Sequence, residues 1–199
     1  SGADVPLPTA PRVRVWQRIL DVLAGPLGLA EAAQTGAVVR LDPAAARAEG
    51  LGQPVRLDVR VDDVTGLYAF AVTVAFDPAA LRVRDANPRT GGVQVIAGEF
   101  LDYESWVILR NEADNAAGKV ELAITQTGTT PGRSGSGVPG SVEFVGLRAG
   151  TSTVSVSEHE LLASAYPDTT PLASQARSAT VTVGGDRFLI YAPRVVRGT

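Results

Sequence analysis

The period of the hydrophobic pattern changes near residue 37, and this change constrains the fold more than any other feature of the chain. Upstream, four apolar side chains have the i, i+3, i+4, i+7 spacing of one helix face: Trp16, Ile19, Leu20 and Leu23. Downstream, apolar and polar residues alternate, as in VRLDVRV at 55–61, which is typical of half-buried strands. We therefore expect a helical extension at residues 1–36, followed by an all-β domain.

The expected helix has sequence signals at both ends. Pro11 stands near its first turn, and Gly25-Pro26 ends it. A short helical turn at LGLAEAAQ is expected to follow. In an alternative interpretation, Val13 and Val15 belong to a strand, because they alternate with arginines. Both interpretations remain open at this point.

Many short alternating segments follow residue 37, separated by turn signals such as Asp77-Pro78 and Gly91-Gly92. The expected strands are Val38–Leu41, Val55–Val61, Tyr68–Phe76, Leu81–Arg84, Val93–Ile96, Trp106–Arg110, Val120–Gln126, Ser141–Val145, Thr153–Val156 and Ala179–Val183. Short strands at this spacing, without helices between them, predict a β-sandwich. We expect the sandwich to span residues 37–183, and a C-terminal extension, 184–199, to hold a short extra strand with Phe188 and Ile190 as its anchors.

Composition excludes several classes of function. A net charge of −3 and a pI near 5.2 argue against nucleic acid as a partner, because such proteins carry a clustered basic surface. The chain has no cysteine, which excludes disulfides and thiolate metal sites. Its longest apolar runs are far too short for a transmembrane segment. The chain starts at a serine and contains no methionine, so we expect a processed protein whose signal peptide was removed, located outside the cell or on its surface.

The stretch GRSGSGVPG at 132–140 contains the spacing G-x-G-x-x-G of dinucleotide-binding loops. That motif requires a strand before it and a helix after it, so that free N–H groups hold the pyrophosphate. Here turn residues precede it, the alternating segment Ser141–Val145 follows, and Pro139 lacks an N–H. We therefore expect a flexible loop that enters a strand and binds no nucleotide.

The sequence contains no convincing catalytic or metal-binding set. His159 is the only histidine, and without other nitrogen or sulfur ligands it is expected to lie in a loop beside the solvated Glu158 and Glu160. The acidic pairs all coincide with expected turns: Asp62-Asp63, Asp102 with Glu104, and Glu112 with Asp114. Calcium bound near Asn111–Asn115 remains an open alternative, although the spacing is not that of an EF-hand. We expect no enzyme, no catalytic residue, no metal and no cofactor.

The order of the strands resembles a known family. The run VRLDVRVDDVTGLYAFAVTVAFDPAALRV, with its Phe76-Asp77-Pro78 followed by Leu81 and Val83, resembles the opening of a cohesin domain. The segments GKVELAITQTG and SVEFVGLRAGTSTVSV are similar to the second half of that family. The resemblance covers about residues 37–183. It implies a nine-stranded jelly-roll β-sandwich, of the kind also found in carbohydrate-binding modules, that is not catalytic and binds dockerin modules through one flat sheet face.

By this resemblance, the flat face consists of Tyr68–Phe76, Trp106–Arg110, Val120–Gln126 and Thr153–Ser157. Because side chains alternate across a strand, Phe70, Val72, Val74 and Phe76 are expected to point inward. The outward residues, which we predict as a partner-binding face, are Ala69, Ala71, Thr73, Ala75, Ala123 and Thr125. Family members that bind dockerins carry polar residues there. The alanines instead predict a smooth surface on which the stripe Trp16, Ile19, Leu20 and Leu23 can pack, in the same chain or in a neighbouring one.

Three functions follow as expectations. The favoured one is a secreted, non-catalytic module for protein–protein interaction, which assembles with other copies through its tails and its flat face into a cell-surface fibre or layer. The second is a cohesin that captures a dockerin-bearing protein. The third is carbohydrate binding, which needs an exposed aromatic platform, and Trp106 with Tyr103 is the only plausible pair for it. Polysaccharide is therefore the least supported partner.

Overall fold

A computed structural model of the chain describes residues 36–101, 103–163 and 169–185. The predicted helix with Trp16, Ile19, Leu20 and Leu23 lies outside the described residues, as does the predicted C-terminal strand with Phe188 and Ile190. Both segments, and the division of the chain at residues 36 and 183, therefore stay predictions. No helix in the described part of the chain is long and apolar enough to cross a membrane.

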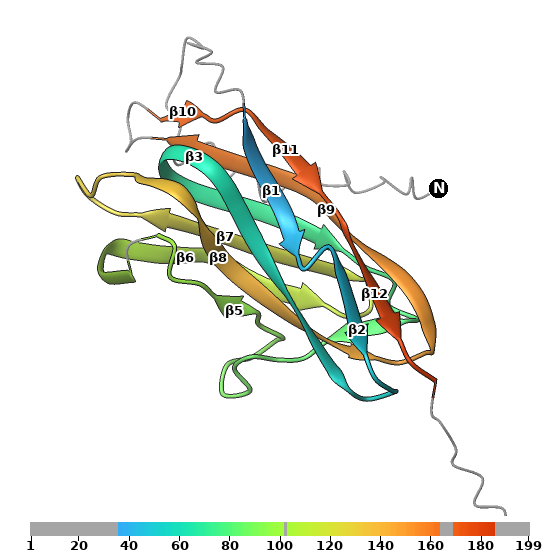
Figure 1. Ribbon diagram of the computed structural model, residues 1–199. Helices are drawn as coiled ribbons and strands as arrows, with labels where there is room; N and C mark the ends of the chain where they lie inside the picture. Colours follow the sequence, from blue (N-terminus) through green and yellow to red (C-terminus); the bar gives the residue numbers. More distant parts are fainter. Residues whose placement is uncertain (1–35, 102, 164–168, 186–199) are drawn as a thin grey trace, which may run out of the picture.

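The described residues form an all-β sandwich, which confirms the predicted fold class (Figure 1). The elements are β1 (Ala37–Asp42), β2 (Ala45–Ala48), β3 (Pro54–Ala75), β4 (Leu81–Val83), β5 (Ile96–Ala97), the 3-10 turn η1 (Tyr103–Ser105), β6 (Trp106–Asp114), β7 (Lys119–Gln126), β8 (Arg133–Gly146), β9 (Gly150–Ala163), β10 (Thr170–Pro171), β11 (Ser174–Arg177) and β12 (Ala179–Val183). One layer follows the order β11-β1-β3-β8, with β4 and β5 beside β8. The other follows β6-β7-β3-β9, and β12 and β2 extend it from the start of β9.

Strand β3 belongs to both layers. Its first half pairs with β1 and β8, and its second half, from Leu67 onward, pairs with β7 and β9. The sequence predicted two strands here, separated by a turn. The turn residues instead form an irregular stretch within one 22-residue strand, where Asp63 and Gly66 have positive φ angles of 56° and 68°. The two bends turn the strand from one layer into the other without ending it.

The core fills the space between the layers with the inward side of each strand. The predicted inward residues of β3, Phe70, Val72 and Val74, are buried in it, and so is Phe76 just beyond the strand. Phe76 meets Phe144 of β8 edge to face, with ring centroids 5.2 Å apart and planes 69° apart. Such an aromatic pair stabilises the fold beyond its buried area. The alternation in the sequence thus predicted the correct face of β3.

The glycine stretch 132–140 is a strand and not a flexible loop, which corrects the sequence-based expectation. Arg133–Gly140 is the first half of β8 and pairs with β3. A Cβ atom at Gly137 would lie 2.0 Å from the Phe100 ring, and one at Gly140 would lie 2.3 Å from Leu122 Cδ2. Glycine is needed at these positions because neighbouring groups pack directly against the strand.

Other strand boundaries also differ from the prediction. Strand β9 is 14 residues long and includes His159, which was expected in a loop. Three short strands, β2, β10 and β11, were not predicted. The described residues form twelve strand segments, where the hydrophobic pattern predicted ten and the family resemblance implied nine. The increase comes largely from short pieces, such as β2, which is separated from β1 at Asp42-Pro43.

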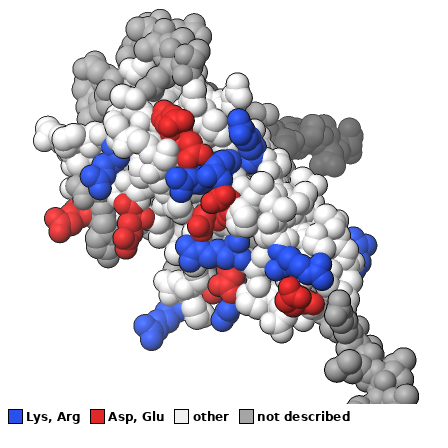
Figure 2. Space-filling model, in the orientation of Figure 1, with Lys and Arg blue, Asp and Glu red and all other residues white. Residues whose placement is uncertain are grey.

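The outer face of the β1-β3-β8 layer carries a ladder of ion pairs, seen as neighbouring blue and red side chains in Figure 2. Asp62 accepts hydrogen bonds from Arg40 and Arg60. Asp58 accepts one from Arg56 and another from the Ser141 hydroxyl. Burial opposes ionisation of both aspartates, but these hydrogen bonds outweigh it and hold the pKa of each carboxyl below its ordinary value. The charged side chains of this face are therefore paired with one another.

Candidate functional site

The four strands expected to form the flat face lie side by side in the order β6-β7-β3-β9. One row across the face runs from Val107 through Thr125 and Ala69 to Leu162. The next row of direct partners runs from Arg110 through Ala123 and Ala71 to Glu160. The part of β9 beside β3 is Ser155–Ala163, so the prediction of Thr153–Ser157 was displaced toward the start of the strand.

The predicted outward residues occupy this face as expected. Ala69, Ala71 and Thr73 alternate with the core residues of β3 and lie beside Ala123 and Thr125 of β7. They are recessed among larger neighbours, and most of them are buried. Ala69 and Leu162 form a small apolar cluster separate from the main core. The centre of the face is thus built from small side chains, as the sequence indicated.

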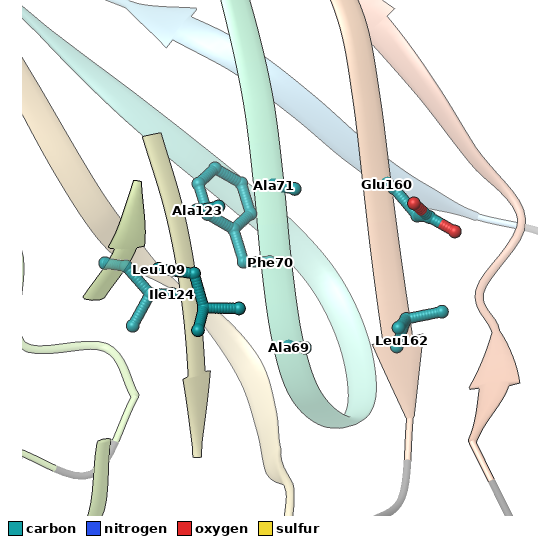
Figure 3. A pocket seen from close by; sticks show the side chains of 8 residues that line it. All are labelled: Ala69, Phe70, Ala71, Leu109, Ala123, Ile124, Glu160 and Leu162. Carbon is teal, nitrogen blue, oxygen red and sulfur yellow. The ribbon is translucent and has the colours of Figure 1, made fainter. Parts of the chain in front are cut away.

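A shallow hollow lies at this centre (Figure 3). Ala69 and Ala71 form its floor on β3, and Ala123 of β7 continues the floor on one side. Leu109 of β6 rises at one edge, and Glu160 and Leu162 of β9 rise at the other. The lining is almost entirely apolar, so this part of the face offers apolar contact to a surface that packs on it.

Glu160 is the one charged group in the lining of the hollow. It stands directly opposite Ala71 in the sheet. Burial raises the pKa of the Glu160 carboxyl, because the charged form loses hydration there. The sequence analysis treated Glu160 as a solvated loop residue, and its position on the face emerges only from the register of β9 with β3.

The rest of the face, toward the Lys119 end of β7, is charged. Glu121 is buried between two cations, with Arg110 Nη2 at 3.2 Å from Oε2 and Lys119 Nζ at 2.8 Å from Oε1. Arg110 also contacts Glu112, at 2.6 Å. Thr73 stands opposite both Glu121 and Glu158. Its hydroxyl oxygen is buried, and no described residue hydrogen-bonds to it. The face therefore joins an apolar half to an ion-paired half.

Strand β6 has an edge at Val107–Leu109 that pairs with no other described strand. Within the described chain it pairs only with β7. Three consecutive apolar side chains, Val107, Ile108 and Leu109, are 42–46% exposed. Further along, Asn111 covers the edge by hydrogen bonding to both the N–H and the carbonyl of Val95, at 2.8 and 2.9 Å. Periodicity predicted the strand but gave no sign that one edge of it is free.

The polar residues considered as catalytic or metal-binding candidates either hydrogen-bond to the backbone or do not gather into one site. His159 Nε2 is 3.3 Å from the carbonyl oxygen of Ser174 on β11. Asn115 hydrogen-bonds to the backbone of Val83, and Asp114 accepts from two turn N–H groups. Among the described residues, no three metal-ligating side chains gather into a site. Asp102 of the predicted acidic pair lies outside the described residues.

Of the predicted aromatic platform for carbohydrate, the structure describes only the Trp106 side chain. Trp106 is half-buried and packs against the core. The side chain of its expected partner, Tyr103, lies outside the described part of the structure. Stacking on a sugar needs an exposed ring face, so Trp106 is poorly placed for it.

Neither a protein-family model nor a curated protein matches the sequence. Solved structures match along most of the chain. The seventh ScaB type I cohesin of Pseudobacteroides cellulosolvens has a TM-score of 0.59 at 14% identity and covers 82% of this chain and 98% of its own. The cohesin in a Coh-OlpA–Doc918 complex from Clostridium thermocellum has a TM-score of 0.58 at 11% identity, covering 75% and 99%. A type II cohesin from the cellulosome of Acetivibrio cellulolyticus has a TM-score of 0.53 at 16% identity, covering 73% and 94%. The β-sandwich of this chain therefore has the cohesin fold.

Proposed function

We propose that this chain is a non-catalytic module for protein–protein interaction and that it binds its partner on the β6-β7-β3-β9 face. The observation that carries the proposal is the apolar hollow over Ala69, Ala71 and Ala123, bordered by an ion-paired half. An apolar centre with a polar border is the usual composition of a protein interface. By contrast, the outer face of β1, β3 and β8 is occupied by its own ion pairs.

The partner that we favour is another copy of the same chain, within a fibre or layer outside the cell. The predicted helix near residues 11–24 offers the apolar stripe Trp16, Ile19, Leu20 and Leu23. Burying these four side chains would contribute on the order of 6–10 kcal/mol before the entropy of ordering is subtracted. The segment can occupy the hollow of its own sandwich or that of a neighbour, and only the second arrangement builds a polymer.

A dockerin-bearing protein is the second candidate partner. Several structurally similar proteins were solved as cohesin–dockerin complexes. The polar half of the face borders the apolar centre with the ion pair of Arg110 and Glu112, and a separate partner would contact it at the rim of its interface. Neither candidate requires a cofactor or a catalytic residue.

Sedimentation of the full chain over a range of concentrations tests the proposal. We expect concentration-dependent association, and we expect Ala71→Glu to abolish it. The added carboxylate would lie beside Glu160 and Ala123, where burying it without a cation is costly. The matched control is Ala117→Glu at an exposed turn position, which should associate like the parent chain.

The same variants separate the alternatives. Circular dichroism should show a folded Ala71→Glu chain, because residue 71 points away from the core. If the parent is a monomer that binds a dockerin-bearing protein and Ala71→Glu does not bind it, the second candidate replaces the first. If the parent neither self-associates nor binds a protein partner, the proposal is wrong.

A further inference from the structure

The free edge of β6 has an unusual composition for an exposed strand. Proteins usually protect such edges with lysine, proline or charged residues, because free backbone groups recruit other strands. The exposed positions here are Val107, Ile108 and Leu109, and the segment 106–110 contains no lysine or proline. A bulge between Ile108 and Arg110 bends the strand but leaves all three side chains exposed. The edge is therefore suited to receive an additional strand.

We propose that residues Arg187–Ala192 of a second copy of this chain pair with this edge of β6. Their sequence, RFLIYA, contains three strongly strand-forming residues, Phe188, Ile190 and Tyr191. Pro193 follows, and because it lacks an N–H it ends the stretch that can pair. The inference rests on the proposed self-association and names which segment meets which edge.

The reach of the chain determines that the strand comes from another molecule. Val183, the last residue of β12, pairs with Gly150 at the start of β9. Val107 lies in the row of Leu162, close to the other end of β9. β9 has 14 residues, so these two rows are about 40 Å apart along the strand. In Figure 1, β12 ends at the lower right and β9 ends at the upper left.

The C-terminal segment is too short to bridge this distance within one molecule. The residues from Gly184 to Ala192 can span at most about 32 Å when fully extended. β6 also lies three strand spacings to the side of β9, each about 5 Å, which lengthens the path further. Phe188 and Ile190 therefore cannot reach Val107 of their own sandwich, but they can reach that of a neighbour.

Charge supports the same pairing. The segment carries Arg187 and is followed by Arg194 and Arg197. The receiving strand carries Glu112 and Asp114 near its end. Because the receiving edge and the end of β12 lie at opposite ends of the sandwich, each copy can donate at one end and receive at the other. Contacts of this head-to-tail kind generate a filament unless the rotation between copies closes a ring.

The absence of cysteine from the chain allows a sharp test by cross-linking. Full-length Val107→Cys and Ile190→Cys variants are mixed and oxidised mildly, and disulfide-linked dimers are counted on a non-reducing gel. The control pair is Leu147→Cys with Ile190→Cys, because Leu147 is as exposed as Val107, at 46%, but adjoins the other end of the sandwich. We expect the Val107 pair to give about tenfold more heterodimer or better, because docking holds the thiols at a high effective concentration.

A second variant, Val107→Lys, places a charged side chain on the exposed edge of β6, which disfavours pairing with a further strand. It should abolish association of the full chain in sedimentation. Equal cross-linking of the test and control pairs, with association unchanged in Val107→Lys, would overturn the inference. If association then persists in Val107→Lys but is lost in Ala71→Glu, the proposed function stands and only the strand pairing is wrong. A parent chain that stays monomeric at every concentration would contradict the proposed self-association, and the strand pairing with it.

Discussion

Arg40 and Arg60 lie directly opposite each other on β1 and β3, although both are positively charged. Like charges in this cross-strand position repel. Asp62 resolves the conflict, because its carboxylate accepts hydrogen bonds from Arg40 Nε at 2.6 Å and from Arg60 Nε at 2.8 Å. Two carboxylates, Asp62 and Asp42, therefore compensate the cations at this point of the β1–β3 pairing.

We expect Asp62→Asn to lower the free energy of unfolding by about 1–2 kcal/mol at neutral pH, because Arg60 loses its ion-pair partner and Arg40 keeps only Asp42. The folded-state pKa of Asp62 lies below its ordinary value. Its contribution to stability is thus present above the ordinary aspartate pKa, about 3.9, and is lost as pH falls through the folded-state value. Denaturant unfolding from pH 7 to pH 2 should show the parent and the variant converging at the acid end. Asp63→Asn is the control, because Asp63 is exposed and asparagine tolerates its positive φ. A constant difference between parent and Asp62→Asn at all pH values would contradict this account.

Replacing Glu160 by glutamine should raise the free energy of unfolding at neutral pH, whereas Asp62→Asn lowers it. Burial raises the pKa of Glu160, so the folded state binds its proton more tightly than the unfolded state does. Stability therefore falls as pH rises from the ordinary glutamate pKa, about 4.3, through the higher folded-state value. Glu160→Gln removes this penalty, and thermal unfolding should show a variant more stable than the parent at pH 7 but similar to it at pH 4. The comparison variant is Glu158→Gln, at an exposed position on the same strand. A Glu160→Gln chain less stable than the parent at pH 7 would show that the carboxylate makes a favourable contact instead.

Gly140→Ala should destabilise the sandwich by about 1–3 kcal/mol through overpacking. The added methyl group would lie 2.3 Å from Leu122 Cδ2 and 3.3 Å from the carbonyl oxygen of Ile96. Leu122 is buried in the core and cannot move away freely. Gly91→Ala is the control, because no atom lies within 4 Å of the corresponding position. Urea unfolding measures both variants, and equal midpoints would mean that β8 does not pack as tightly as described.

The sequence predicted the sandwich and the inner face of its longest strand because alternation reports burial directly. Phe70, Val72 and Val74 alternate with alanine and threonine, and no other arrangement buries them together. The first half of β8 was missed, because Gly-Ser repeats carry no hydrophobic pattern and resemble a loop. The continuity of β3 was missed for a related reason, since Asp62-Asp63 and Gly66 are ordinary turn residues that here form bends within a strand.

The candidate face was predictable only in part. Alternation placed Ala69, Ala71 and Ala123 outward, but it could not reveal which residues stand across from them. Glu160 reaches the hollow because β9 continues past residue 157 and pairs with Ala71, and register of this kind depends on long-range contacts. The free edge of β6 was equally hidden, because no local signal distinguishes an edge strand from a central one.

The presence of β3 in both layers has a consequence for how the domain unfolds. Neither layer can separate without breaking ladders that the other layer shares, so local opening cannot spread through one sheet alone. The described body should therefore unfold in a single cooperative transition, with coincident fluorescence and circular dichroism curves. The strands that pair with β3 also bring together residues far apart in the chain, such as Ala71 and Glu160. Folding must therefore close long loops. Folding should be slow, in the range of milliseconds to seconds typical of β-sandwiches.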